Sequence, residues 1–307
     1  MEMPEEVKNA ADVVYRFAIK TPVFRDRHMS LRIRRDVLLK METFQPVHSF
    51  KIRGATNKLC RIEEKKVITA SSGNHGIAVA YVCSELGKEA TVVVPENVNK
   101  AKLRMIRELG AETIAFGNSS DERISYARKL SKQTGAPLIP SFDDIQIIAG
   151  QGTAGLEIEP PDVLICPVGG GGLIAGIASA LTDKKTRIFG VQPEGAAAMA
   201  QSLQLARQVS IKAKTIADGI AVETPGKLPL EIVRNRVEAI LTVSDEEIID
   251  AFREMWEYSH VLMEPASAST VAALVRYKER ILRKEDRSVM LIISGANVSD
   301  EALRLLV

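Results

Sequence analysis

The stretch VLICPVGGGGLIAGIASAL, residues 163–181, has the composition of three consecutive elements. A short apolar run ends at Val168, four glycines fill positions 169–172, and an apolar run rich in alanine follows. Glycines leave backbone N–H groups uncovered, and the start of a helix adds its positive end at the same point. The stretch therefore predicts a strand, a turn suited to a phosphate group, and a helix.

Two alternatives to this phosphate site stay open on these residues alone. Gly170, Gly172 and Ala175 also fit the loose dinucleotide-binding pattern, and Glu194 ends the next predicted strand, where a ribose-binding acid would lie. A tight turn without a ligand is the other alternative. Four glycines cost backbone entropy that a plain turn does not require, which favours a ligand.

Short β-branched runs alternate with stretches of helical period along the chain, which predicts parallel sheets covered by helices. Strands are expected at 67–70, 90–95, 113–116 and 137–141, with helices at 74–86, 99–109 and 121–133. A second alternation predicts strands at 163–168, 187–192, 239–243 and 289–293, with helices after Gly172, Asp245 and Glu264. Near the start, a helical face runs from Val7 to Ala18, and Pro22 is expected to end that helix.

Composition limits the class of protein. A chain of 307 residues with 46% hydrophobic residues can bury a large core and is expected to form two domains. Its net charge of +2 indicates neither a nucleic acid nor a membrane surface as partner. Cys60, Cys83 and Cys166 are far apart, as in reduced core cysteines. No signal peptide is expected at the start, so a cytoplasmic location is predicted.

A second turn with the composition of a ligand site is SSGNHG, residues 71–76. It follows a predicted strand and opens the next helix, so hydroxyls, an amide and free N–H groups meet at a helix N-terminus. Such a group suits a carboxylate. The alternative is an ordinary helix cap made by Ser72 or Asn74, with nothing bound.

Lys51 lies in SFKIRG, residues 49–54, between an apolar run and a glycine. If it is buried, its amine loses solvation and its pKa falls, which favours the neutral form that attacks an aldehyde. On this segment alone, a solvated lysine at the start of a helix is the favoured interpretation. Ser294 stands at the end of a predicted buried strand, where open α/β sheets bind ligands, although turns also use serine there.

Taken together and in order, these segments resemble the pyridoxal-phosphate enzymes of the tryptophan synthase β fold type. The resemblance is closer to the branch of threonine dehydratases and serine racemases. It rests on SFKIRG (49–54), SSGNHG (71–76), IAGQGTAGLEI (148–158), GGGGL (169–173), TIADGI (215–220), MEPASA (263–268) and ISGAN (293–297). It implies two domains, each an open, mostly parallel sheet flanked by helices: a large one formed by 1–64 and 142–307, and a small mobile one formed by 65–141.

The resemblance assigns roles to individual residues. Lys51 would hold the cofactor and remove the α-proton of the substrate, and Ser72 would be the second catalytic residue if the enzyme racemises. The residues implied at the cofactor are Phe50, Lys51, Asn74, Gly169, Gly170, Gly171, Gly172, Leu173, Gly219, Glu264 and Ser294. The residues implied at the substrate carboxylate are Ser71, Ser72, Gly73, Asn74 and His75.

The resemblance implies a lyase, a threonine dehydratase that eliminates the hydroxyl of L-threonine or L-serine to give a 2-oxo acid and ammonia. Ile52 after the lysine is typical of dehydratases and racemases, whereas related synthases usually have an aspartate there. A serine racemase or serine dehydratase is the first alternative, and a nicotinamide-dependent oxidoreductase is a less favoured one. The resemblance also implies a dimer or tetramer.

Two further sites carry expectations. No metal is expected near Gln192 and Glu194, because Gln192 and Ala198 stand where the cation site of the racemases has carboxylates. His48, close to Lys51, is either a local acid or a surface residue, and the surface interpretation is favoured.

Overall fold

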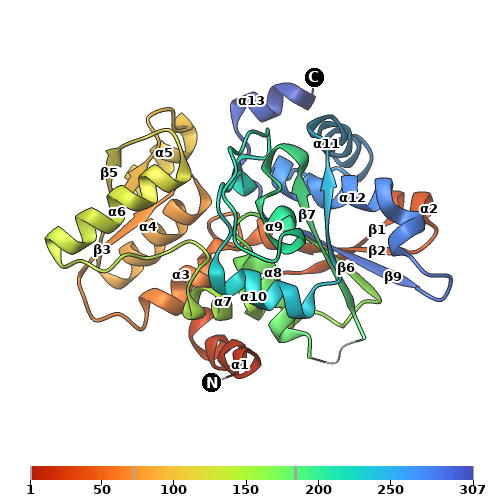
Figure 1. Ribbon diagram of the computed structural model, residues 1–307, viewed down its shortest axis with the longest axis horizontal. Coiled ribbons are helices and arrows are strands. Elements are labelled where there is room, and N and C mark those ends of the chain that lie inside the picture. Colours follow the sequence, from red (N-terminus) through yellow and green to blue (C-terminus); the bar gives the residue numbers. More distant parts are fainter. Residues whose placement is uncertain (1, 72, 183–184, 307) are drawn as a thin grey trace.

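The computed structural model describes residues 2–71, 73–182 and 185–306. Within these residues the chain forms a three-stranded sheet and a six-stranded sheet, each covered by helices, lying beside one another (Figure 1). All strand pairs except one are parallel. The prediction of open, mostly parallel sheets flanked by helices is confirmed.

The smaller sheet has the order β3 (Lys66–Ala70), β4 (Glu89–Val94), β5 (Glu112–Ala115). Alternate residues of its strands face opposite sides. Val67 and Val92 pack in the cluster that contains α4 (Asn74–Leu86), whereas Ile68 and Val93 pack against α6 (Ser120–Thr134). Both faces of β3 and β4 are covered, and their buried positions are mostly alanine, valine and isoleucine. Helix α5 (Lys100–Glu108) connects β4 to β5.

The larger sheet has the order β1-β2-β9-β6-β7-β8, with β1 antiparallel to β2. Its strands are β1 (Val23–Asp26), β2 (Asp36–Met41), β6 (Val163–Pro167), β7 (Arg187–Pro193), β8 (Ala239–Val243) and β9 (Ser288–Ile293). In β9, Val289 and Leu291 pack toward α11 (Asp245–Ser259) and α12 (Pro265–Ile281). Met290 packs on the other face toward α8 (Gly172–Ala180). Helices thus cover both faces of this sheet too.

The remaining helices complete the two bodies. They are α1 (Met3–Val14), α2 (Arg27–Ile33), α3 (Lys51–Leu59), α7 (Ile145–Gly152), α9 (Ala198–Gln204), α10 (Lys227–Arg236) and α13 (Asp300–Leu303). Helix α3 packs against α4 of the smaller body and against α7, which in turn packs against α8 of the larger body. The start of α3 therefore lies where the two sheets meet.

Glycines allow the backbones of α3, α7 and α8 to touch. A Cβ atom on Gly150 of α7 would lie 2.6 Å from the carbonyl oxygen of Arg53 in α3, and one on Gly176 of α8 would lie 2.4 Å from that of Ile148. No side chain fits at such distances. The segment IAGQGTAGLEI, which contributed to the family resemblance, is therefore a packing motif in this structure.

Some predicted elements differ from the structure. Residues 137–141 do not form a strand: a single bridge joins Leu138 to Ile68, because Pro137 and Pro140 lack the N–H groups that would extend the ladder. The first helix ends at Val14, well before Pro22. Strands β1 and β2 and helices α2, α7, α9, α10 and α13 were not predicted. Among the described residues, no helix combines the length and apolar composition needed to cross a membrane.

Candidate active site

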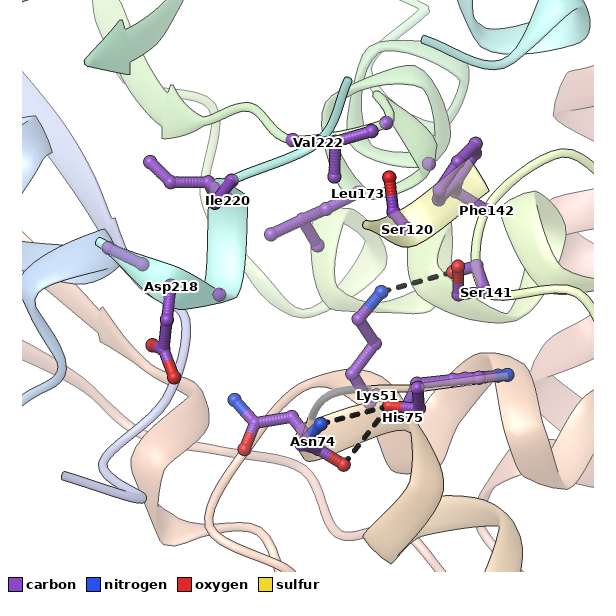
Figure 2. A pocket seen from close by; sticks show the side chains of 18 of the residues that line it. Lys51, Asn74, His75, Ser120, Ser141, Phe142, Leu173, Asp218, Ile220 and Val222 are labelled. Atoms are coloured by element: carbon purple, nitrogen blue, oxygen red, sulfur yellow. Dashed lines mark hydrogen bonds between the residues drawn. The ribbon is translucent and has the colours of Figure 1, made fainter. Parts of the chain in front are cut away.

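A cavity lies where the carboxyl ends of β3, β6 and β9 meet, and side chains from both bodies line it (Figure 2). It brings together all the predicted site residues that the structure describes. These are Phe50, Lys51, Ser71, Gly73, Asn74, His75, Gly169, Gly170, Gly171, Gly172, Leu173, Gly219, Glu264 and Ser294. Ser72 lies outside the described residues.

Lys51 is the first residue of α3, and its side chain projects into the cavity (Figure 2). Its Nζ atom donates a hydrogen bond to the carbonyl oxygen of Ser141 at 3.0 Å and lies 5.1 Å from the centre of the Phe50 ring. Burial lowers the pKa of Lys51 to about 8. The helix-start interpretation of this lysine is correct, but the interpretation as a solvated residue is wrong. A neutral amine is accessible near neutral pH.

Helix α3 is anchored by a buried ionic network. The guanidinium of Arg53 contacts Glu42 at 2.7 Å and Glu157 at 2.6 Å, and Lys40 contacts Glu157 at 2.5 Å. The side chains of Arg53, Lys40 and Glu42 are completely buried. Two cations balance two carboxylates, so the network fixes the start of α3, and with it Lys51, without an unpaired buried charge.

The glycine turn presents backbone to the cavity. Helix α8 begins at Gly172, and Gly171 has a φ of 97°, a conformation that favours glycine. A Cβ atom on Gly170 would lie 2.3 Å from ring carbons of Phe142. The turn therefore excludes side chains and leaves N–H groups at the positive end of α8, as an anion site requires.

A second ionic group crosses from the smaller body to the larger one. Lys102 of α5 is 3% exposed, and its Nζ lies 2.8 Å from Asp218 and 3.3 Å from Glu264. The other oxygen of Glu264 accepts a hydrogen bond from Asn74 Nδ2 at 2.8 Å, while Asn297 Nδ2 donates to Asn74 Oδ1 at 2.8 Å. These contacts fix the orientation of the Asn74 amide at the cavity wall.

The charges in this group affect one another. Burial raises the pKa of Glu264 to about 6, the Lys102 ammonium opposes this rise, and the Asp218 carboxylate adds to it. Burial alone would lower the pKa of Lys102, but Glu264 and Asp218 hold it above its ordinary value. Lys102 therefore stays charged, and Glu264 is ionised above about pH 6.

His75 and Ser294 are buried polar residues at this site. Burial, and then the charge of Lys51, lower the pKa of His75 to about 3, so the ring is neutral and its Nε2–H donates to Ile139 O at 3.2 Å. His75 thus supports the turn and is no acid near neutral pH. The hydroxyl of Ser294, just after β9, lies 3.2 Å from that of Ser267.

Six cavity residues that carry polar or aromatic groups were missed by sequence reasoning: Lys102, Ser120, Arg123, Ser141, Phe142 and Asp218. Asp218 stands inside the TIADGI segment next to Gly219, so that segment held a signal for it. The others belong to α5, α6 and the segment that begins at Ser141, which contain none of the motifs.

The two remaining expectations concern residues away from the cavity. His48 is exposed, so the surface interpretation is confirmed. The Nε2 atom of Gln192 donates a hydrogen bond to Val168 O, and its Oε1 atom accepts one from Ala200 N. Glu194 forms an ion pair with Arg276 at 3.0 Å. The described residues contain no group of acids, histidines or cysteines that could hold a metal ion, and the absence of a metal stays a prediction.

Comparison with known proteins identifies the family. The sequence pattern of the family described as "Pyridoxal-phosphate dependent enzyme" matches residues 14–295. The chain belongs to this family. The predictions of the family and of pyridoxal phosphate as cofactor are confirmed.

Individual members of the pyridoxal-phosphate family show how similar the chain is. An L-threonine ammonia-lyase of Thermotoga maritima is 37% identical over 305 residues, covering 96% of this chain and 75% of that protein. The processed form of threonine deaminase isoform 2 from Solanum lycopersicum has a TM-score of 0.92 at 32% identity, covering 99% of this chain and 92% of that one. Maize serine racemase has a TM-score of 0.93 at 31% identity, covering 98% and 95%.

The cavity of this family member fits its cofactor chemically. Pyridoxal phosphate carries an aldehyde, a phosphate and a pyridine nitrogen. Lys51 places an amine of lowered pKa in the cavity, the turn at Gly170 admits no side chain, and Ser294 supplies a buried hydroxyl. Each group of the cofactor thus has a chemically suitable counterpart among the lining residues.

Proposed function

We propose that this protein is a threonine dehydratase, an ammonia-lyase that converts L-threonine, and also L-serine, to a 2-oxo acid and ammonia. The observation that carries the proposal is the Lys51 amine, of lowered pKa, in the same cavity as the glycine turn and Ser294. Relatives that are 36% and 37% identical over most of this chain bear the names L-threonine dehydratase and L-threonine ammonia-lyase, which supports it.

In the proposed reaction Lys51 has two roles. Bound pyridoxal phosphate supplies an electron sink for the pair of electrons left when the α-proton departs. Lys51 would hold the cofactor through its amine, and the neutral form of that amine would remove the α-proton of the substrate. Its lowered pKa makes the neutral form of the amine far more populated near neutral pH than that of an exposed lysine.

Other residues bind and orient. The glycine turn would hold the phosphate, with Leu173 beside it, and Asn74 would donate to the phenolic oxygen of the ring. The Ser71–Asn74 turn at the start of α4 would bind the substrate carboxylate. Ser294 would face the pyridine nitrogen of the cofactor. A hydroxyl there does not force protonation of that nitrogen, so the ring would be a moderate electron sink. A moderate sink suits a rapid elimination.

We also propose that residues 65–141 move as a small domain that closes over the cavity and excludes water. The contact of Lys102 with Asp218 and Glu264 supports this idea, because it joins α5 to the larger body across the site. Single-molecule distances between labels on the two bodies that stay constant on addition of substrate would contradict it.

The function is tested by a substrate panel on cofactor-loaded protein. We expect 2-oxobutanoate from L-threonine and pyruvate from L-serine, with a visible absorption band from the bound cofactor. D-Serine as the main product from L-serine would instead favour the serine racemase alternative. A colourless protein that pyridoxal phosphate leaves unchanged would overturn the proposal.

Replacing Lys102 with methionine should shift the decline of elimination at low pH to a higher pH. Protonated Glu264 is a poorer acceptor for Asn74, so elimination should fall as the pH drops through the pKa of Glu264, about 6. The Lys102 charge lowers that pKa, and its loss should move the acidic limb of kcat/KM upward by about one pH unit.

The matched control is Lys100→Met, an exposed lysine at the start of the same helix. Its acidic limb should coincide with that of the wild type. An unshifted limb in Lys102→Met would show that Lys102 does not tune Glu264.

We further propose a cytoplasmic homodimer. Phe24 and Phe44 are about half exposed and in contact with one another, with ring centres 6.1 Å apart, and Leu31 and Tyr258 are more exposed still. Exposed apolar side chains of this size support association of copies of the chain.

The free cysteines among the described residues support a reducing compartment, as the cytoplasm is. A monomer mass by light scattering at micromolar concentration would contradict the dimer, and secretion of the protein by its host would contradict the location.

A further inference from the structure

Ser267 carries a buried hydroxyl behind Ser294, and the proposed elimination gives it no role. It lies in the first turn of α12 and is completely buried. Its Oγ atom lies 3.2 Å from the Oγ atom of Ser294, a residue that lines the cavity. Among the residues that the structure describes, Ser267 is the one hydrogen-bond partner of the Ser294 hydroxyl. The state of Ser267 therefore decides how Ser294 presents itself to the cavity.

Ser267 also contacts both backbone polar groups of Gly295. The N–H of Gly295 donates to Ser267 Oγ at 3.2 Å, and Ser267 Oγ donates to the carbonyl oxygen of Gly295 at 3.2 Å. A hydroxyl has one hydrogen and two lone pairs. When the hydrogen goes to Gly295 and one lone pair accepts the N–H, the second lone pair is left for Ser294. Ser294 is then the donor in the contact between the two hydroxyls.

The opposite arrangement, in which Ser267 donates to Ser294, uses the polar groups less completely. The carbonyl oxygen of Gly295 also accepts a hydrogen bond from Glu264 N at 2.9 Å, and its two lone pairs can serve both donors. With Ser267 donating to Ser294, the hydrogen of Ser294 has no acceptor among the described residues. Buried hydroxyls favour arrangements in which every hydrogen is used. The pair therefore favours the arrangement in which Ser294 offers only lone pairs to the cavity.

The lone pairs of Ser294 suit one state of the cofactor better than the other. A pyridine nitrogen is an acceptor when it is unprotonated and an N–H donor when it is protonated. A hydroxyl whose hydrogen is held by Ser267 can only accept, so two lone pairs would face each other at an unprotonated nitrogen. At a protonated nitrogen the hydroxyl accepts a charge-assisted hydrogen bond.

We propose that Ser267 is a positioning residue that holds the hydrogen of Ser294, so that Ser294 accepts a hydrogen bond from a protonated pyridine nitrogen. The inference rests on the proposed elimination and deepens it, because it specifies how this chain tunes the electron sink of the site. A protonated ring accommodates the electron pair left at Cα better than a neutral ring does. The site should therefore also exchange the α-proton of an amino acid that has no β-leaving group, such as L-alanine.

The exchange of L-alanine balances without a further reactant. The Cα–H bond breaks, and the amine of Lys51 takes the proton. The ammonium of Lys51 exchanges its hydrogens with water and returns one of them to Cα, where a new bond to hydrogen forms. No electron is gained or lost overall, so neither an oxidant nor a reductant is needed.

The first test observes the ring nitrogen directly. Pyridoxal phosphate that carries an isotope label at this nitrogen gives an NMR signal whose position differs between the protonated and the unprotonated form. We expect Ser267→Ala to move the signal of the bound cofactor toward the unprotonated position at neutral pH, because Ser294 regains a hydrogen to donate. Ser267→Cys fills the same space with a weaker donor and acceptor, so its signal should lie between the two.

The matched control is Ser269→Ala, which removes another completely buried hydroxyl of α12 that donates to Ala266 O at 2.7 Å. Its signal should coincide with that of the wild type. In a Ser294→Ala background, Ser267→Ala should cause no further change, because the hydroxyl that Ser267 orients is gone. A further change of the same size there would overturn the inference, since Ser267 would then act through the backbone of Gly295.

The second test compares two reactions of the loaded enzyme. Exchange of the α-proton of L-alanine in deuterated water is followed by NMR, and 2-oxobutanoate release from L-threonine is measured beside it. We expect Ser267→Ala to lower the exchange about tenfold and the elimination about threefold or less, as the loss of one hydrogen bond allows. Elimination is less sensitive because the departing hydroxyl relieves Cα of the electron pair.

The outcomes separate this inference from the proposed function. An unchanged nitrogen signal in both Ser267→Ala and Ser267→Cys would overturn the inference, and turnover of L-threonine would then leave the proposed function intact. Equal losses of exchange and elimination would also overturn it, because Ser267 would then serve a step common to both. A changed signal with exchange of L-alanine but no turnover of L-threonine would support the role of Ser267 and contradict the elimination.

Discussion

Replacing Lys51 with alanine should lower the rate of L-threonine elimination by about 10³-fold or more, since the variant loses both the anchor of the cofactor and the base that removes the α-proton. The visible band of the bound cofactor should vanish as well. Because the network around Arg53 holds α3 without help from Lys51, the far-ultraviolet circular dichroism should not change.

The measurement is 2-oxo acid release under saturating pyridoxal phosphate. Lys66→Ala, an exposed lysine at the start of β3, is the control and should keep full activity. An added small primary amine should restore part of the Lys51→Ala activity, because it can act as the missing base. Full activity of Lys51→Ala without such an amine would remove this lysine from the mechanism.

Replacing Arg53 with methionine should lower the free energy of unfolding by about 3–5 kcal/mol. The change removes the guanidinium that contacts Glu42 and Glu157 and leaves two buried carboxylates with only Lys40 to balance them. Breaking one side of a buried network is costly because the remaining charges cannot reach water.

Urea unfolding followed by fluorescence provides the measurement. The matched control is Arg104→Met, which removes an exposed pair with Glu108 and should cost about 0.5 kcal/mol or less. A loss in Arg53→Met no larger than in Arg104→Met would show that the network contributes little to the anchoring of α3.

The sequence predicts those parts of the fold whose local pattern agrees with their tertiary surroundings. The strand, glycine turn and helix at 163–181 follow from composition, because glycines are required at that turn by close contacts as well as by conformation. Strand β2 was not predicted, because a lysine such as Lys40 within a short apolar run is typical of a half-exposed segment. The distant Glu157 and the carbonyl oxygen of Thr21 make that burial possible.

The residues of the candidate site also fall into those that the sequence predicts and those that it does not. Residues in glycine-rich or serine-rich turns could be located because turn chemistry is local, and the described ones do line one cavity. Lys102 and Arg123 could not, since each is an ordinary basic residue on an amphipathic helix until the smaller body lies against the larger one. The burial of both residues and the ion-pair partners of Lys102 depend on the two bodies together, and no single segment contains that information.

Backbone contact through Gly150 and Gly176 has a consequence for cofactor choice. These contacts join α3, which carries Lys51, to α8, which begins in the glycine turn. Because α7 touches the backbones of both helices, packing sets the distance between the start of α3 and the glycine turn. We therefore expect the site to bind pyridoxal phosphate in preference to aldehyde phosphates that are shorter or longer.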